Sequence, residues 1–175
     1  MTEEFLEKLN LYEKDLIQRT EYITYGIEQG EFNVTKISPV SNPRLVSLKP
    51  TGGLWASDIR ADFGWKEWCI GENFHLDALK AHTVFHLKEN ARILEIKTGK
   101  EVRNIFDKYR ADRGIDFVKL SCIYDAVSCP EITSDLYYSL YGWDCSSIVI
   151  LNPEIIEVDE RDKDINRMVY EEENN

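Results

Sequence analysis

Several features are missing from this sequence, and each absence excludes a class of protein. No apolar run approaches the ~20 residues that a membrane-spanning helix needs. Positive charge is scarce, because 21 lysine and arginine residues stand against 32 aspartate and glutamate residues, for a formal net charge of -11. Nonspecific binding to nucleic acid needs clustered lysine and arginine, so this charge argues against it. The charge fits a protein that avoids membranes and meets basic partners.

Cysteine is present, but never as a C-x-x-C motif. The four cysteines are Cys69, Cys122, Cys129 and Cys145. Their spacing forms no zinc ribbon or knuckle, and the N-terminal segment lacks the pattern of a secretory signal. We therefore expect free thiols in a reducing compartment, which indicates a cytoplasmic protein.

The common catalytic signatures are also lacking. The sequence contains no G-x-S-x-G elbow, no Walker A loop, no G-x-G-x-x-G fingerprint and no HExxH motif. His82 and His86 stand four positions apart. On a predicted strand such residues lie roughly 13 Å apart, too far to chelate one ion. The sequence therefore predicts no metal site.

At 175 residues, with a hydrophobic content of 43%, the chain is long enough for one domain with one core. Apolar residues three and four positions apart predict a helix over residues 3–29, packed on the outside of the domain. We expect this N-terminal helix to fill residues 1–30 and the main domain to fill residues 31–160. Residues 161–175 are expected to form an acidic tail with a frayed end.

The remaining segments mix strands and helices. Strands are predicted over FNVTKISPV, LWASDI and SSIVILNPEIIEV, with a hairpin over TVFHLKENARILEIKTG and an extended segment within DFVKLSCIYDAVSC. Helices are predicted over DFGWKEWCIGENF, LDALKAH, KEVRNIFDKYRADRG and SDLYYSLYG, the last capped by Ser134. Because regular βαβ alternation is absent, the sequence predicts an α+β domain with mixed, mostly antiparallel sheets and flanking helices.

The stretch LKPTGGLWASDI, residues 48–59, places Gly52 and Gly53 directly before a predicted strand. One interpretation is an ordinary turn into a core strand. The other is a backbone that passes close to a bound ligand, where only glycine fits. Lys49, in the same stretch, is either a solvated loop lysine or a contact for a pyrophosphate.

Four segments follow one another along the chain and are informative as an ordered set: VTKISPV, LKPTGGLWAS, YDAVSCPE and LYGWDCSSIVILNPEIIEV. In this order and spacing the chain resembles the ADP-ribosyltransferase superfamily, in its compact bacterial, phage and toxin-like branch. The resemblance covers about residues 33–158. It implies a split sandwich of two sheets and NAD as the substrate.

The resemblance also implies a set of site residues. The implied NAD-binding residues are Lys36 or Ser38 on the first strand, Gly53, Leu54 and Trp55 beside the nicotinamide, and Tyr124. The implied catalytic residues are Ser57, which matches the serine of the Arg–Ser–Glu branch, and Asp144 or Glu131, since Ser147 stands near the usual glutamate. Such a carboxylate stabilises the positive charge that develops on the ribose when the glycosidic bond of NAD breaks. If neither acid substitutes, the domain binds without catalysing.

Each of these residues also has a purely structural interpretation. The tryptophans Trp55, Trp65, Trp68 and Trp143 are typical of a core. Ser57 is equally suited to a strand end, and Asp144 to a turn after Gly142. The sequence thus predicts an ADP-ribosyltransferase that modifies a protein or nucleic-acid acceptor, or an NAD hydrolase. The alternative is a non-catalytic acidic interaction protein, such as an inhibitor or an anti-defence or immunity factor. In either case we expect a monomer or small oligomer without membrane or metal.

Overall fold

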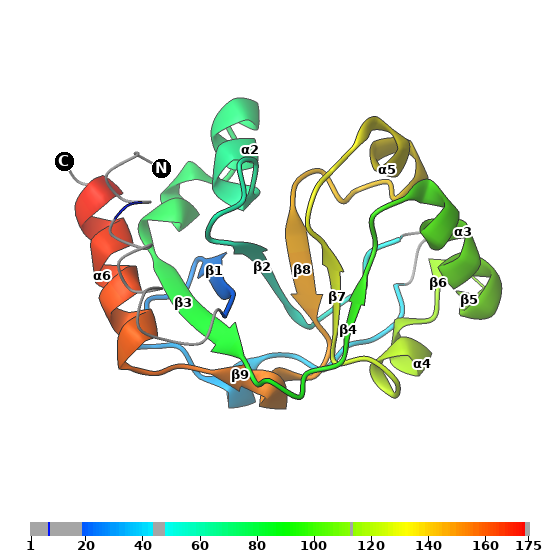
Figure 1. Ribbon diagram of the computed structural model, residues 1–175, viewed down its shortest axis with the longest axis horizontal. Coiled ribbons are helices and arrows are strands. Elements are labelled where there is room, and N and C mark those ends of the chain that lie inside the picture. The colour runs from blue at the N-terminus through cyan, green and yellow to red at the C-terminus, as the bar shows by residue number, and fades with distance from the viewer. Residues whose placement is uncertain (1–6, 8–18, 44–47, 113, 174–175) are drawn as a thin grey trace.

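The structure is a computed structural model, in which residues 7, 19–43, 48–112 and 114–173 are described (Figure 1). The strands are β1 (Glu21–Tyr25), β2 (Leu54–Asp58), β3 (His82–Leu87), β4 (Ile93–Glu95), β5 (Arg110–Ala111), β6 (Gly114–Ile115), β7 (Ala126–Cys129), β8 (Ser147–Ile150) and β9 (Ile156–Glu157). The α-helices are α2 (Trp65–Glu72), α3 (Gly99–Lys108), α4 (Phe117–Ser121), α5 (Ser134–Ser139) and α6 (Glu160–Glu173). Short 3-10 helices are η1 (Val34–Lys36), η2 (Leu76–Lys80) and η3 (Pro153–Ile155).

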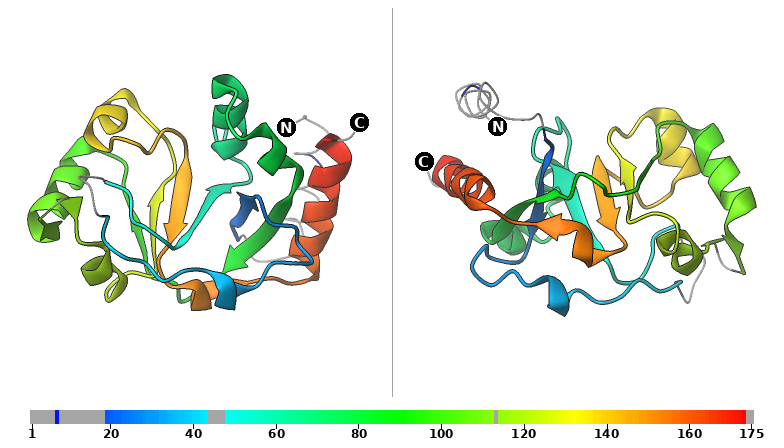
Figure 2. Two further views of the ribbon diagram at one scale, coloured as in Figure 1. Left: turned by 180° about the vertical axis from the view of Figure 1, so that it is seen from behind. Right: turned by 60° about the horizontal axis from the view of Figure 1, so that its bottom comes forward.

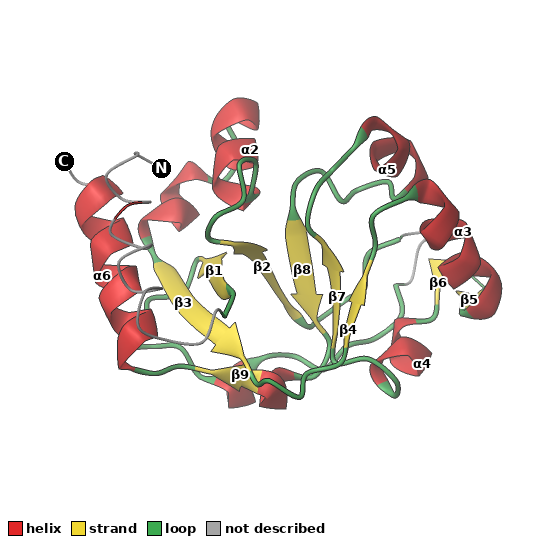
Figure 3. Ribbon diagram, in the orientation of Figure 1, coloured by secondary structure: helices red, strands yellow, loops and turns green. Residues whose placement is uncertain are grey.

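Seven strands form one curled sheet in the order β4-β7-β8-β2-β1-β3-β9. The pair β4–β7 is parallel, and the other pairs of this sheet are antiparallel. The sheet bends into a half-barrel, with helices along its outer side (Figures 1 and 3). The predicted single-domain α+β class is thereby confirmed. The two sheets expected of a split sandwich are joined here into one.

The join between the two halves of the sheet lies at β1 and β2. These strands pair at Tyr22↔Asp58 and Ile23↔Ser57, whereas β1 and β3 share five residue pairs. Beyond these two pairs, the Thr24 hydroxyl links the strands by donating to the carbonyl of Trp55 at 2.9 Å. We call this short junction between the two halves of the sheet the fork.

Three buried clusters hold the sheet and its helices together. On the outer side, Trp143, Val149 and Leu136 belong to a cluster that packs α3, α4 and α5 against one half. On the other half, Ile165 and Val169 of α6 pack against β1 and β3. Inside the curl, Phe85 and Ile148 belong to a third cluster that joins the two halves. Figure 2 shows the segment after β1 running along the lower edge of the sheet.

Both ends of the chain differ from the prediction where they are described. Residues 21–25 of the predicted N-terminal helix form strand β1, while residues 1–6 and 8–18 lie outside the described residues. The predicted acidic tail is helix α6, because Ile165 and Val169, four positions apart, bury one face against Ile23. The predicted strand FNVTKISPV is also wrong, since η1 begins there with Asn33 as its side-chain cap.

The predicted hairpin is wrong as well. Strand β3 pairs with β1 and β9, whereas β4 pairs with β7 in the other half of the sheet. The connection between them runs along the lower edge of the sheet instead of turning back (Figure 1). Five of the six residues of β3 are buried, which suits a strand with partners on both edges. Helix α4 replaces part of the predicted extended segment, and the cap of α5 is Thr133, not Ser134.

The predictions for β2, α2 and β8, and for His82 and His86 on a strand, are confirmed. The helix predicted over residues 100–114 is confirmed for residues 100–108, which belong to α3, whereas residues 110–111 and 114 belong to the paired strands β5 and β6. Among the described residues, no helix has both the length and the apolar content that crossing a membrane requires.

Candidate functional site

A cavity of about 390 Å³ opens at the fork between β1 and β2. This volume lies within the range of about 300–1,000 Å³ that is typical of small-molecule sites. Its walls come from β1, β2, the start of α2 and the segment before β8. We call it the fork cavity. It is lined by Ile23, Thr24, Tyr25, Ile27, Lys49, Leu54, Trp55, Ala56, Ser57, Trp65, Trp143, Asp144, Cys145 and Ser147.

The alternation of side chains along β2 determines what faces the outer part of this cavity. Leu54 and Ala56 belong to the inner core cluster, while Trp55 packs against the outer one. The ring of Trp55 meets that of Trp143 edge to face, with centroids 4.7 Å apart. Trp143 is 1% exposed, and its indole N–H donates to the carbonyl of Leu48 at 2.9 Å. Trp143, which also lines the cavity, thus fixes the orientation of Trp55.

An ion pair lies over the Trp55 ring. Lys49 Nζ is 3.8 Å from Asp144 Oδ2 and 5.3 Å from the centroid of that ring. The alkyl chain of Lys49 lies against Gly142, which has a φ of +92° and leaves room for it. Because both charges are partly shielded from water, their interaction is stronger than that of a fully exposed pair. The cavity therefore presents a carboxylate, a cation and an aromatic face together.

Ser57 lies in the same cavity, but its hydroxyl is already hydrogen-bonded. Its Oγ donates to the carbonyl of Ser146 at 2.9 Å and accepts from the backbone N–H of Trp65 at 3.0 Å. These bonds tie the first turn of α2 to the segment before β8. The structural interpretation of Ser57 thus has a defined geometry.

The other predicted site residues lie elsewhere. Lys36 and Gly53 line a separate hollow of about 720 Å³ beside Phe32, and Ser38 is exposed close by. Tyr124 packs against the outer core cluster, and Glu131 is exposed after β7. The structure thus brings Leu54, Trp55, Ser57 and Asp144 together at the fork cavity, and leaves Lys36, Ser38, Gly53, Tyr124 and Glu131 outside its lining.

The double glycine has a reason within the chain itself. Gly52 and Gly53 have φ angles of +78° and +72°, which other residues adopt only with strain. A Cβ on Gly52 would clash with the carbonyl of Pro39, and one on Gly53 would lie 2.7 Å from the carbonyl of Ile150. The two residues therefore form a turn in which the backbone passes close to protein rather than to a ligand.

Sequence reasoning missed the contribution of β1. Thr24 and Tyr25 line the fork cavity, but they fall within the region that the helical spacing assigned to a helix. The alternation in EYITY, followed by Gly26, is the signal that indicates a strand there. Cys145 was not expected in the wall either. Burial raises the pKa of its thiol to about 12, so it is protonated at neutral pH and no nucleophile.

A charged cluster at the base of α6 lies apart from the fork cavity. One ligand atom each of His86, Asp159 and Asp162 lies within 4.8 Å of the others, a donor set that suits a metal ion. The guanidinium of Arg19, however, contacts Asp159 at 2.6 and 3.0 Å and Asp162 at 3.1 Å. It holds the pKa of Asp159 well below its usual range, whereas burial raises the pKa of Asp162. Arg19 thus provides positive charge among these three residues.

Comparison of the chain with family models, with curated proteins and with solved structures gives no match.

Proposed function

We propose that the protein is an ADP-ribosyltransferase-like enzyme that uses NAD as its substrate. The observation that carries this proposal is the presence of Asp144 and Trp55 in one cavity of suitable size, with Lys49 beside both. Trp55 comes from β2 and Asp144 from the segment before β8, as the resemblance implies. The proposal assigns the nicotinamide end of NAD to the fork cavity.

The proposed reaction uses the carboxylate electrostatically. The bond between the ribose carbon C1 and the nicotinamide nitrogen breaks, and its electron pair stays with nicotinamide, which leaves as a neutral molecule. Asp144 stabilises the positive charge left on the ribose. The nucleophile of the acceptor, or water, then bonds to that carbon and loses a proton. The ring of Trp55 stacks on the nicotinamide, and the ammonium group of Lys49 binds the diphosphate of NAD.

A direct test distinguishes Asp144 from Glu131 as the catalytic acid. Asp144→Asn keeps the shape of the side chain and removes the charge, so it is expected to lower the rate of nicotinamide release by about 10²–10³. Glu131→Gln is expected to change that rate by less than about twofold, because Glu131 is exposed and outside the cavity. Chromatography of released nicotinamide measures both rates. Absence of NAD binding by calorimetry at about 1 mM would contradict the proposal.

A second function is favoured by the bonds of Ser57 and Asp144. The Ser57 hydroxyl both donates and accepts within the protein, and Asp144 lies near a cation of its own chain. These contacts fit a non-catalytic interaction protein whose fork cavity is stabilised by its own side chains. This alternative predicts that the wild-type protein binds a partner and releases no nicotinamide from NAD.

A further inference from the structure

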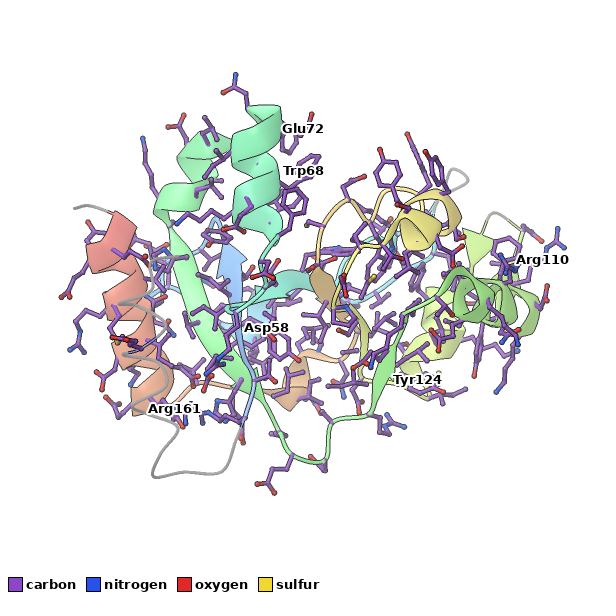
Figure 4. All side chains as sticks on the ribbon, turned by 45° about the horizontal axis from the view of Figure 1, so that its top comes forward. Asp58, Trp68, Glu72, Arg110, Tyr124 and Arg161 are labelled. Carbon is purple, nitrogen blue, oxygen red and sulfur yellow. The ribbon has the colours of Figure 1, made fainter. Side chains whose placement is uncertain are left out.

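A second hollow adjoins the fork cavity. It has a volume of about 520 Å³ and lies between α2 and α5. Asp144 lines both hollows, and Trp65 of the fork cavity stacks on Trp68 of the second, with ring centroids 5.0 Å apart. Figure 4 shows Trp68 and Glu72 on α2 at the side that faces α5. We call this hollow the α2–α5 groove, lined by Phe63, Trp68, Glu72, Tyr137, Tyr138 and Asp144 together with Ile132, Thr133 and Ser134.

The groove combines exposed aromatic rings with negative charge. Tyr138 is 83% exposed and Tyr137 is 50% exposed, although both carry large rings. Phe63, also in the groove lining, is 47% exposed, and exposed rings that gather in one place mark an interaction site where scattered ones do not. The described residues that line the groove include two carboxylates, Glu72 and Asp144, and neither lysine nor arginine. Because Asp144 is already 3.8 Å from Lys49 Nζ, Glu72 is the main carboxylate that the groove presents to a cation. Aromatic faces and carboxylates together attract a cationic side chain, through cation–π and ionic interactions.

We infer that the α2–α5 groove binds a lysine- or arginine-bearing segment of a protein partner. The net charge of -11 favours such a partner over nucleic acid, whose phosphates it would repel. This inference rests on the proposed function in one respect: since Asp144 belongs to both hollows, a segment in the groove lies next to the proposed site of bond cleavage. Of the two acceptor classes expected from the sequence, it selects the protein.

Binding of a labelled peptide tests the inference without any enzymatic readout. The probe is a fluorescent peptide in which Gly-Arg-Gly-Lys is repeated three times, and fluorescence anisotropy is measured in the absence of NAD. A second peptide with glutamine at every arginine and lysine serves as the uncharged control, and a short single-stranded DNA is the third probe. The wild-type chain is expected to bind the basic peptide alone.

Two groove variants and two matched controls locate the binding. Tyr138→Ser and Glu72→Gln are each expected to weaken binding about two- to fivefold, and the double variant about tenfold. Tyr141→Ser is the control for the aromatic change, because Tyr141 is 80% exposed but outside the groove lining. Glu28→Gln is the control for charge on an exposed residue away from the groove. Both controls are expected to bind like the wild type.

Three results would overturn the inference: no binding of the basic peptide at about 1 mM, equal loss in groove and control variants, or stronger binding of the DNA. These outcomes are distinct from failure of the proposed function. Nicotinamide release without peptide binding supports the proposed enzyme and excludes the groove as a binding site for a basic segment. Peptide binding with the expected losses, but without nicotinamide release, retains the groove and supports the non-catalytic alternative.

Discussion

Replacement of Gly53 by alanine separates a structural role of the double glycine from a role in NAD binding. Gly53 has a φ of +72°, and its missing Cβ would lie 2.7 Å from the carbonyl oxygen of Ile150 and 3.3 Å from a methyl group of Val149. The backbone conformation alone costs an alanine about 1–2 kcal/mol. Displacing the packed backbone of β8 adds about 1–3 kcal/mol. Gly53→Ala is therefore expected to lower the free energy of unfolding by about 2–5 kcal/mol.

Thermal unfolding followed by circular dichroism measures this loss. For a chain of this length each kcal/mol corresponds to about 2–4 °C, so the midpoint is expected to fall by roughly 4–20 °C. Gly71 provides a matched control in the same chain, because it lies in α2 with no heavy atom within 4 Å of its missing Cβ. Gly71→Ala is expected to raise the midpoint by about 1–4 °C, since alanine favours a helix over glycine.

The ligand interpretation of Gly53 predicts the opposite pattern. If the glycine serves only to admit NAD, Gly53→Ala keeps the wild-type midpoint and loses NAD affinity. A midpoint within about 2 °C of the wild type would therefore refute the structural reasoning. Equal shifts of the same sign in Gly53→Ala and Gly71→Ala would refute it as well, because Gly53 has a positive φ and Gly71 does not.

Three further predictions concern charge and thiol chemistry. Glu21 is fully buried among three arginine side chains, so Glu21→Ala is expected to lower the free energy of unfolding, measured in guanidinium, by about 3–5 kcal/mol. A loss of unfolding free energy no greater than that of the exposed Glu28→Gln would contradict this prediction. Arg92 holds the pKa of Asp125 well below its usual range. This carboxylate therefore stabilises the fold at pH values above its unfolded-state pKa of about 3.9, and the stabilisation is lost as the pH falls through its folded-state pKa. Asp125→Asn is therefore expected to lower the melting temperature by several degrees at neutral pH, with a difference from wild type that shrinks in acid; an equal difference at both pH values would count against the pairing. Cys122 is the exposed cysteine, so a thiol reagent is expected to label one site rapidly in the folded protein and all four sites after unfolding, and rapid labelling of a second thiol would contradict the burial of the others.

Much of the local structure was predictable from the sequence. The short period-two run LWASD gives β2, and the spacing of Trp65, Trp68 and Cys69 gives α2. These elements are encoded by neighbouring residues, whose side chains define a buried face before any long-range contact forms. Trp55, Ser57 and Asp144 were predicted to lie at one site by resemblance, and they line one cavity.

The errors concern segments whose structure depends on a distant partner. The sequence predicts a hairpin over residues 83–99 because two alternating runs flank a turn, yet β3 and β4 lie in opposite halves of the sheet. The acidic composition of α6 suggested a frayed end, but docking of Ile165 and Val169 on β1 and β3 provides the apolar contact that a charged helix needs. Local patterns do not specify which strand edge or helix face will be available.

The sequence by itself determined the α+β class, the positions of the central strands and helices, and the set of side chains with the required chemistry. The tertiary structure alone decided which of those side chains meet. Ser57 hydrogen-bonds to a carbonyl 89 positions away, and this contact exists because antiparallel pairing aligns β2 with β8. The same pairing brings Asp144 to Trp55 and leaves Glu131 at the surface. Strand pairing is a long-range choice among edges, and residue spacing along the chain does not encode it.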